Sequence, residues 1–177
     1  YPRVFLPDYN DWNDVPPPYR TLYFLHGYSG GALETATFTN FALYAAVHGI
    51  AIVMIDGDNS FYVDDEQRNA YYSRYVGEEI VEVTRKLLPL SHRREDTFIA
   101  GISMGGYGAL KCALLRPEQF AGCAAFSSVC ILEECEEMAD DAMRREIQGI
   151  LGLHYELLRQ NELTEIASRF DPSAPKP

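Results

Sequence analysis

The chain has 177 residues, a length that suits one domain with a sizeable hydrophobic core. Hydrophobic residues make up 47% of it and aromatic residues 12%, which excludes a disordered chain. The net charge of −11 argues against nucleic acid and against an anionic membrane surface as partners. No apolar run approaches the ~20 residues that a membrane-spanning helix needs, so we expect no membrane association.

Strands and helices alternate along the chain. We expect strands at roughly 1–6, 21–26, 50–55, 97–102 and 121–128, with a long polar loop at 8–20. We expect helices near 38–48, 70–88 and 104–116, and a mainly helical segment at 131–170, made of one broken helix and a second one from 162 to 170. Continuous apolar strands such as 50–55 are typical of parallel strands covered on both faces. The sequence therefore predicts an α/β fold with a doubly wound, mostly parallel sheet.

The stretch Gly101-Ile102-Ser103-Met104-Gly105 lies between a predicted strand and a predicted helix. A G-x-S-x-G sequence in that context is typical of the nucleophile elbow of α/β-hydrolases. The turn is sharp, and we expect side chains two residues either side of Ser103 to clash.

A second feature, His26-Gly27, ends the strand predicted at 21–26. In this fold the loop after an early strand supplies one amide of the oxyanion hole, and the residue after the nucleophile supplies the other. The amides of Tyr28 and Met104 are the candidates.

Ser103 needs a general base, because a serine hydroxyl is a poor nucleophile at neutral pH. His26 ends a strand and is expected to shape the following loop, while His48 and His92 occupy a helix end and a polar connection. Only His154 follows Ser103, as the usual order Ser, Asp, His requires. It lies on a helical stretch rather than on a loop at the sheet edge, so we do not expect it to be the base.

The chain resembles the esterase D group of α/β-hydrolases, close to the tributyrin-type esterases and S-formylglutathione hydrolases. The resemblance depends on LHGYSG at 25–30, NSFYVD at 59–64, YVGEE at 75–79 and TFIAGISMGGYG at 97–108, and it extends to about residue 170. It implies a serine carboxylesterase without a cofactor that hydrolyses short-chain acyl esters or thioesters of small molecules through an acyl-serine. It also implies Ser103 as nucleophile, the Tyr28 and Met104 amides as oxyanion hole, and a triad Asp and His that this chain does not contain.

Asn59, Ser60 and Tyr62 follow the third predicted strand, at the sheet edge where ligands of open α/β sheets bind. We expect them to bind substrate, with Tyr62 as a wall of the acyl or alcohol pocket, although an ordinary loop aromatic fits as well. Asp56 and Asp58 end the same strand, but one loop offers too few carboxylates for a metal site.

The four cysteines include no C-x-x-C pair and no nearby histidine at metal spacing, which favours a reduced, cytoplasmic protein without a metal. The chain starts inside a predicted strand and ends in a Pro-rich linker at 173–177, so we expect residues 1–177 to be a single domain that is incomplete at both ends.

Two other functions stay open: acyl transfer by the same fold, and a non-catalytic domain that keeps the elbow as scaffold. We expect residues 1–177 alone to be inactive, and an open sheet edge to favour a homo-oligomer.

Overall fold

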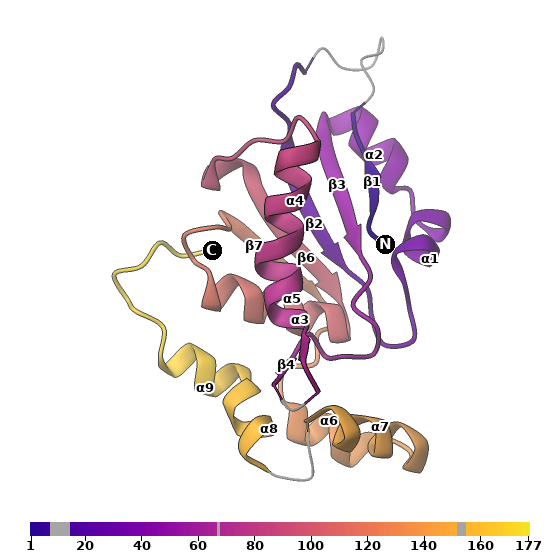
Figure 1. Ribbon diagram of the computed structural model, residues 1–177, viewed down its shortest axis with the longest axis vertical. Coiled ribbons are helices and arrows are strands. Elements are labelled where there is room, and N and C mark those ends of the chain that lie inside the picture. The colour runs from indigo at the N-terminus through magenta and orange to yellow at the C-terminus, as the bar shows by residue number, and fades with distance from the viewer. Residues whose placement is uncertain (8–14, 67, 152–154) are drawn as a thin grey trace.

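A five-stranded sheet forms the centre of the computed structural model, which describes residues 1–7, 15–66, 68–151 and 155–177 (Figure 1). Its strands are β1 (Arg3–Phe5), β2 (Arg20–Leu25), β3 (Ile50–Ile55), β6 (Thr97–Ile102) and β7 (Gly122–Phe126), in the order β1-β3-β2-β6-β7. β1 runs antiparallel to β3, and the other pairs are parallel. The five predicted strands are therefore confirmed, and so is the mostly parallel sheet.

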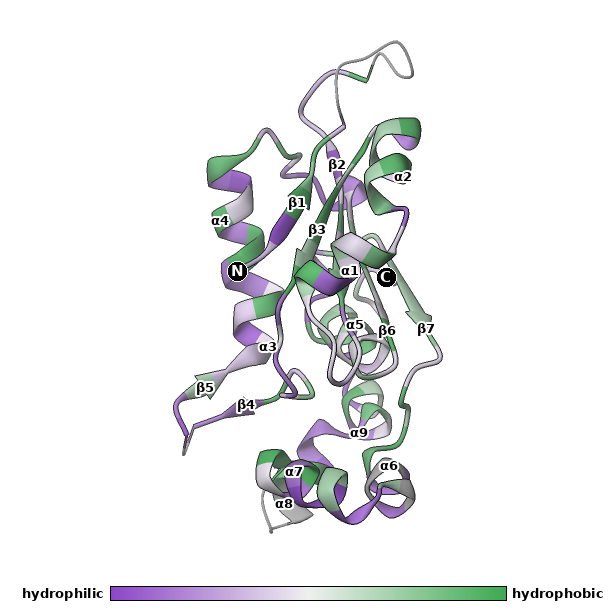
Figure 2. Ribbon diagram, turned by 90° about the vertical axis from the view of Figure 1, so that its right-hand side faces the viewer, coloured by the Kyte–Doolittle hydropathy of each residue, from purple (hydrophilic) through white to green (hydrophobic). Residues whose placement is uncertain are grey.

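Helices cover both faces of this sheet (Figure 2). α4 (Ile80–Leu87) and α5 (Met104–Leu115) cover one face, where Tyr23 and Leu25 belong to the larger apolar core. α1 (Ala32–Phe38) and α2 (Phe41–His48) cover the other face, where Phe24 belongs to a second core. Alternate residues of β2 thus point to opposite faces, as the period of a strand requires.

The first helix differs from the one expected at 38–48, because α1 precedes α2 and was not foreseen. The carboxylate of Asp56 accepts a hydrogen bond of 2.7 Å from the amide of Ala32, in the first turn of α1. This cap comes from the end of β3, so no local signal before Ala32 marks the start of the helix. Gly49 ends α2 in the left-handed conformation, with φ of 60°.

The single helix expected at 70–88 is also wrong in its first half. A small hairpin comes first, in which β4 (Asp64–Asp65) pairs with β5 (Ala70–Tyr71), and α3 (Tyr72–Arg74) and a π-helical turn (Tyr75–Glu79) precede α4. The Asp64 carboxylate accepts a hydrogen bond of 2.7 Å from the amide of Ser73. This contact between the hairpin and α3 is not visible in the helical periodicity of the sequence.

Four helices follow β7 in the described residues, beyond the carboxyl ends of the strands: α6 (Leu132–Met138), α7 (Asp141–Leu151), α8 (Tyr155–Asn161) and α9 (Leu163–Ser168) (Figure 1). The expected broken helix plus one more is therefore wrong in detail. Asp140 caps α7 by accepting hydrogen bonds from the amides of Ala142 and Met143 at 3.0 and 2.8 Å. The Glu162 carboxylate accepts a hydrogen bond of 2.9 Å from the amide of Leu132 and so fixes the start of α6.

β7 is an edge strand, and its side chains Ala124, Ala125 and Phe126 are exposed. The expected self-association through this open edge stays a prediction, which size-exclusion chromatography of residues 1–177 tests.

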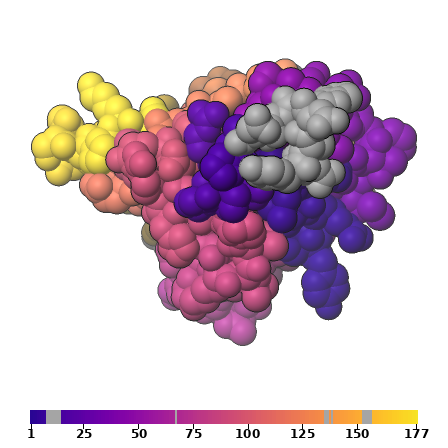
Figure 3. All heavy atoms as spheres, turned by 90° about the horizontal axis from the view of Figure 1, so that it is seen from above, coloured from indigo at the N-terminus to yellow at the C-terminus, as the bar shows by residue number. Residues whose placement is uncertain are grey.

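The two ends of the chain lie apart. In the view from above, the C-terminal residues project to one side, away from the indigo N-terminal segment (Figure 3). No helix in the described part of the chain is long and apolar enough to cross a membrane.

Candidate active site

Ser103 occupies the turn between β6 and α5, with φ of 56° and ψ of −119°. Such a conformation is rare for a residue with a side chain and costs of order 1–3 kcal/mol. Three hydrogen bonds hold it: the Ser103 amide donates to the carbonyl of Phe126 at 2.9 Å, and its carbonyl accepts from the amides of Tyr107 at 3.1 Å and Val129 at 3.4 Å. The side chain is partly exposed, so the turn presents the hydroxyl at the carboxyl end of the sheet.

The glycines on either side of Ser103 are required by close backbone contacts. A Cβ on Gly105 would lie 2.1 Å from the carbonyl oxygen of Leu25, and one on Gly101 would lie 2.2 Å from that of Gly105. Both contacts are with backbone atoms, which cannot move aside without shifting β2 or α5. The predicted clash two residues either side of the serine is thus confirmed.

The loop 26–30 lies directly against this turn. β2 pairs with β6 in parallel so that Leu25 lies opposite Gly101. The segments that follow the two strands therefore begin side by side. A Cβ on Gly27 would be 3.3 Å from the Cβ of Ser103 and 3.3 Å from the carbonyl oxygen of Ile102. The structure therefore brings together the two segments that the sequence predicted to form the site.

The backbone amides of Tyr28 and Met104, near Ser103, have no acceptor among the described residues. Met104 begins α5, and the first amides of a helix have no partner within it. Its amide also carries part of the positive end of the helix dipole. Both are therefore available to donate to a ligand.

The residues after β3 support the loop 26–30. The His26 ring accepts a hydrogen bond at Nε2 from the Gly57 amide at 2.9 Å, and its Nδ1 lies 2.7 Å from the Gly27 carbonyl. The Tyr62 hydroxyl donates to the His26 carbonyl at 2.9 Å, and the Asn59 side-chain oxygen accepts from the Ser29 amide at 2.8 Å. Each contact fixes the path of the loop beside Ser103.

This support corrects the substrate-binding role expected for Tyr62 and Ser60. The side chain of Tyr62 is 0% exposed and Ser60 is 8% exposed. Ser60 Oγ donates to the Gly57 carbonyl at 2.5 Å and accepts from the Tyr62 amide at 3.0 Å. A fully buried ring cannot wall a pocket that is open to substrate, so both residues support the loop from below. Asn59 is partly buried, and its contact with substrate stays a prediction.

Sequence reasoning missed Glu146. From α7 its carboxylate accepts a hydrogen bond from the Tyr28 hydroxyl and lies 3.4 Å from the side-chain nitrogen of Asn59. Burial, together with this carboxylate, raises the pKa of Tyr28 to about 12. No local motif marks Glu146, because its role depends on how α7 lies over the loop.

No side chain among the described residues makes a hydrogen bond with the Ser103 hydroxyl, so none of them is held there as its base. Both nitrogens of His26 are occupied within the loop, as expected of a residue that shapes it. His48 and His92 are exposed; the His48 ring lies near Tyr44, and His92 lines a hollow beside α4. His154 lies outside the described residues.

Metal ligands do not gather in the described part of the chain: no group of three or more His, Cys, Asp or Glu side chains there could hold an ion. Asp56 instead accepts from the amide of Ala32 and stabilises α1.

Comparison with known proteins points the same way. An acetyl esterase of Caldicellulosiruptor saccharolyticus is 39% identical over 122 residues, which are 69% of this chain and 46% of that protein. The chain thus spans about half the length of the curated relatives it matches. The fluorophosphonate-binding serine hydrolase FphF of Staphylococcus aureus superposes with a TM-score of 0.79 at 28% identity, covering 98% of this chain and 69% of that one.

The S-formylglutathione hydrolase FrmB of the same organism superposes with a TM-score of 0.79 at 26% identity, covering 99% of this chain and 69% of that one. Both neighbours are hydrolases, and the chain has the α/β-hydrolase fold. The family model described as "Putative esterase" matches residues 2–150. The chain therefore belongs to this esterase family.

Proposed function

We propose that this chain carries the nucleophile and the oxyanion hole of a serine carboxylesterase. The observation that supports it most is the position of Ser103, strained between two glycines, with loop 26–30 against it. The 39% identity with an acetyl esterase supports the reaction type. The substrates are small-molecule esters or thioesters with short acyl groups.

In the first step Ser103 Oγ attacks the carbonyl carbon of the ester, and its proton passes to a base. The carbonyl oxygen becomes an oxyanion that accepts hydrogen bonds from the amides of Tyr28 and Met104. Removing one such donor typically costs on the order of 100-fold or more in rate. The C–O bond of the ester, or the C–S bond of the thioester, then breaks, the departing alcohol or thiol takes up the proton, and Ser103 is acylated.

In the second step water attacks the acyl-serine with the base accepting its proton, and the carboxylic acid leaves as Ser103 regains its hydrogen. The resemblance to the esterase D group implies that this base is a histidine held by an aspartate. No cofactor or metal takes part. The three free cysteines of the described chain, Cys112, Cys123 and Cys130, support a reduced compartment such as the cytoplasm.

The test uses the complete gene product that contains residues 1–177. A fluorophosphonate probe should label Ser103, as located by mass spectrometry, and Ser103→Ala should abolish labelling and hydrolysis of p-nitrophenyl acetate. Ser127→Ala is the matched control, because Ser127 is an exposed serine at the end of β7. Labelling of another serine overturns the assignment, and a folded but unlabelled protein favours the non-catalytic alternative.

The substrate part of the proposal has its own test. Rates should fall along a series of p-nitrophenyl esters from acetate to octanoate, and EDTA should leave them unchanged. Preference for octanoate, or loss of activity in EDTA, contradicts it. A product analysis with methanol present separates hydrolysis from acyl transfer, since a transferase forms mainly the methyl ester.

A further inference from the structure

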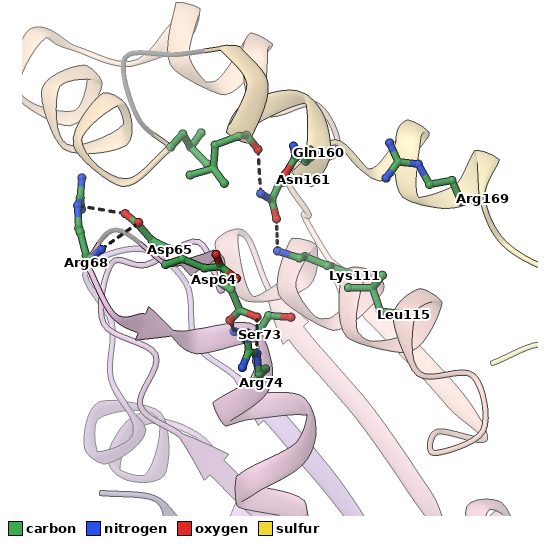
Figure 4. A pocket seen from close by; sticks show the side chains of 13 residues that line it. Asp64, Asp65, Arg68, Ser73, Arg74, Lys111, Leu115, Gln160, Asn161 and Arg169 are labelled. Atoms are coloured by element: carbon green, nitrogen blue, oxygen red, sulfur yellow. Dashed lines mark hydrogen bonds and ion pairs between the residues drawn. The ribbon is translucent and has the colours of Figure 1, made fainter.

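A large cavity lies away from Ser103, between the hairpin β4–β5, α5 and the helices α8 and α9 (Figure 4). Its volume is about 800 Å³, and a neighbouring cavity of about 290 Å³ shares part of its wall, including Lys111 and Arg169. Lys111 follows Ser103 by eight residues on α5, which is about 12 Å along the helix. The cavity is therefore separate from the nucleophile.

The side chain of Lys111 is the unusual feature of this wall, because it is only 3% exposed. Its ammonium donates to the side-chain oxygen of Asn161 on α8 and, at 3.1 Å, to the carbonyl of Tyr62. Figure 4 shows Lys111 reaching from α5 toward Asn161. Both acceptors are neutral, and an ammonium has three N–H groups. Among the described residues no carboxylate forms an ion pair with it, and Asp64, which is already paired with Arg74, acts on the ammonium only from a longer distance.

A buried charge without a partner is costly, and here burial lowers the pKa of Lys111 to about 8. The amine still carries its proton for most of the time at pH 7. An anion in the cavity would supply the missing counter-charge and use the remaining N–H.

The other charges of the wall indicate which kind of anion fits. Asp64 pairs with Arg74 at 3.6 Å and Asp65 with Arg68 at 3.2 Å, so these carboxylates are already engaged. With Glu66 and Arg169, the lining has three acidic and four basic side chains. Arg169 in turn pairs with Glu165 at 3.6 Å, so Lys111 is the cation of this lining that makes no ion pair with a described residue, and this favours a monoanion over the more highly charged phosphate.

Apolar side chains also line the cavity. Leu115 lies one turn further along α5, and Leu151 and Leu157 come from α7 and α8. We propose that this cavity binds a small organic monocarboxylate, with its carboxylate on the Lys111 ammonium and its hydrocarbon part along these leucines.

Isothermal titration of the complete gene product with hexanoate at pH 7 tests the proposal. We expect a Kd of about 1 mM or lower, weaker binding of acetate, which lacks the hydrocarbon part, and weaker binding of inorganic phosphate. Lys111→Met should raise the Kd of hexanoate at least about tenfold, while Lys86→Met, at an exposed lysine on α4, should leave it unchanged. A Kd above about 10 mM, tighter binding of phosphate, or equal affinity in Lys111→Met overturns the proposal.

A second measurement keeps the proposal testable where Lys111→Met fails to fold. Crystals soaked in 6-bromohexanoate should give anomalous bromine density beside Leu115 and Leu157. Density beside Ser103 and Tyr28 would instead assign the carboxylate to the oxyanion hole and overturn the proposal, and so would no density at all.

Discussion

The hydroxyl of Tyr28 donates a hydrogen bond to the carboxylate of Glu146, which lies 118 positions later in the chain. This contact joins loop 26–30, which bears one of the two free amides, to α7 of the C-terminal helices. Tyr28 also packs its ring near that of Phe61, at 6.2 Å between centroids. Loop 26–30 is therefore held by contacts with α7 and by separate contacts with the residues that follow β3.

We predict that Glu146→Ala lowers kcat of the complete gene product about fivefold to tenfold with little change in KM. Losing the hydrogen bond removes about 1 kcal/mol that orients the Tyr28 amide toward the transition state. Steady-state kinetics with p-nitrophenyl acetate measure the change in kcat and KM. Glu146→Gln, which keeps a hydrogen-bond acceptor at this position, should recover part of the lost rate. Arg145→Ala, at the preceding exposed position of α7, is the control.

A double-mutant cycle checks that the effect passes through Tyr28. Tyr28→Phe should cost about as much as Glu146→Ala, and the double variant should cost no more than either single one. Additive losses, or a change confined to KM, would show that Glu146 acts in another way.

The elbow glycines give a prediction about folding. Gly105→Ala places a Cβ 2.1 Å from the Leu25 carbonyl oxygen and should destabilise the protein by more than about 3 kcal/mol, measured by urea unfolding. Gly149→Ala is the matched control, since the nearest atom to its Cβ is 3.9 Å away, on Arg68. That change should stabilise α7, by up to about 1 kcal/mol. A well-folded Gly105→Ala protein would contradict the geometry of the elbow.

Tyr62→Phe separates a supporting role from a role in substrate binding. The change leaves the His26 carbonyl without its buried donor and should cost about 1–3 kcal/mol of unfolding free energy. KM for p-nitrophenyl acetate should stay the same, since the ring does not reach the surface. Tyr44→Phe, at a tyrosine of α2 that is 47% exposed, is the control. An altered KM at unchanged stability would return Tyr62 to the substrate pocket.

The sequence predicts the sheet and the elbow well, because both depend on local patterns. The run 50–55 is apolar at every position, and the spacing of Gly101, Ser103 and Gly105 requires one backbone geometry. Contacts between distant segments explain what was missed. α1 is capped by Asp56 from β3, and the start of α6 is fixed by Glu162, thirty residues after Leu132.

The same reason explains the errors within the site. Asn59, Ser60 and Tyr62 do lie beside loop 26–30, as their position after a strand predicted. Whether a side chain at that edge faces substrate or supports the loop depends on its direction, which periodicity does not reveal. Glu146 and Lys111 have roles only because α7 and α8 fold back over the sheet edge.

We predict that residues 1–177 alone hydrolyse p-nitrophenyl acetate barely or not at all. Ser103 has no base among the described residues, and losing a triad member costs several orders of magnitude in rate. Turnover of purified residues 1–177 is compared with that of Ser103→Ala in the same chain. A rate far above the variant's would show that a base lies within this chain, and His154→Ala would then be the first variant to test.

The last prediction concerns Lys111 and pH. Burial lowers its pKa in the folded protein to about 8, whereas an unfolded lysine titrates near 10.5. Between these values the unfolded chain binds more protons than the folded one, so the contribution of Lys111 to stability rises with pH, by up to about 1.4 kcal/mol per pH unit. Below pH 8 both states are protonated, and the contribution stays at its lowest value.

Buried tyrosines such as Tyr107, whose pKa is raised by burial, titrate above pH 10 in the unfolded chain and lower the stability there. The Lys111 contribution is therefore measured as a difference between the parent and Lys111→Met, by urea unfolding at intervals from pH 7 to 10. We expect the parent's advantage to be constant up to about pH 8 and to grow from there to pH 10. Lys86→Met, at an exposed position, controls for the loss of a lysine as such. A difference that stays flat across this range, or falls, would show that Lys111 is not a buried cation without a counter-ion.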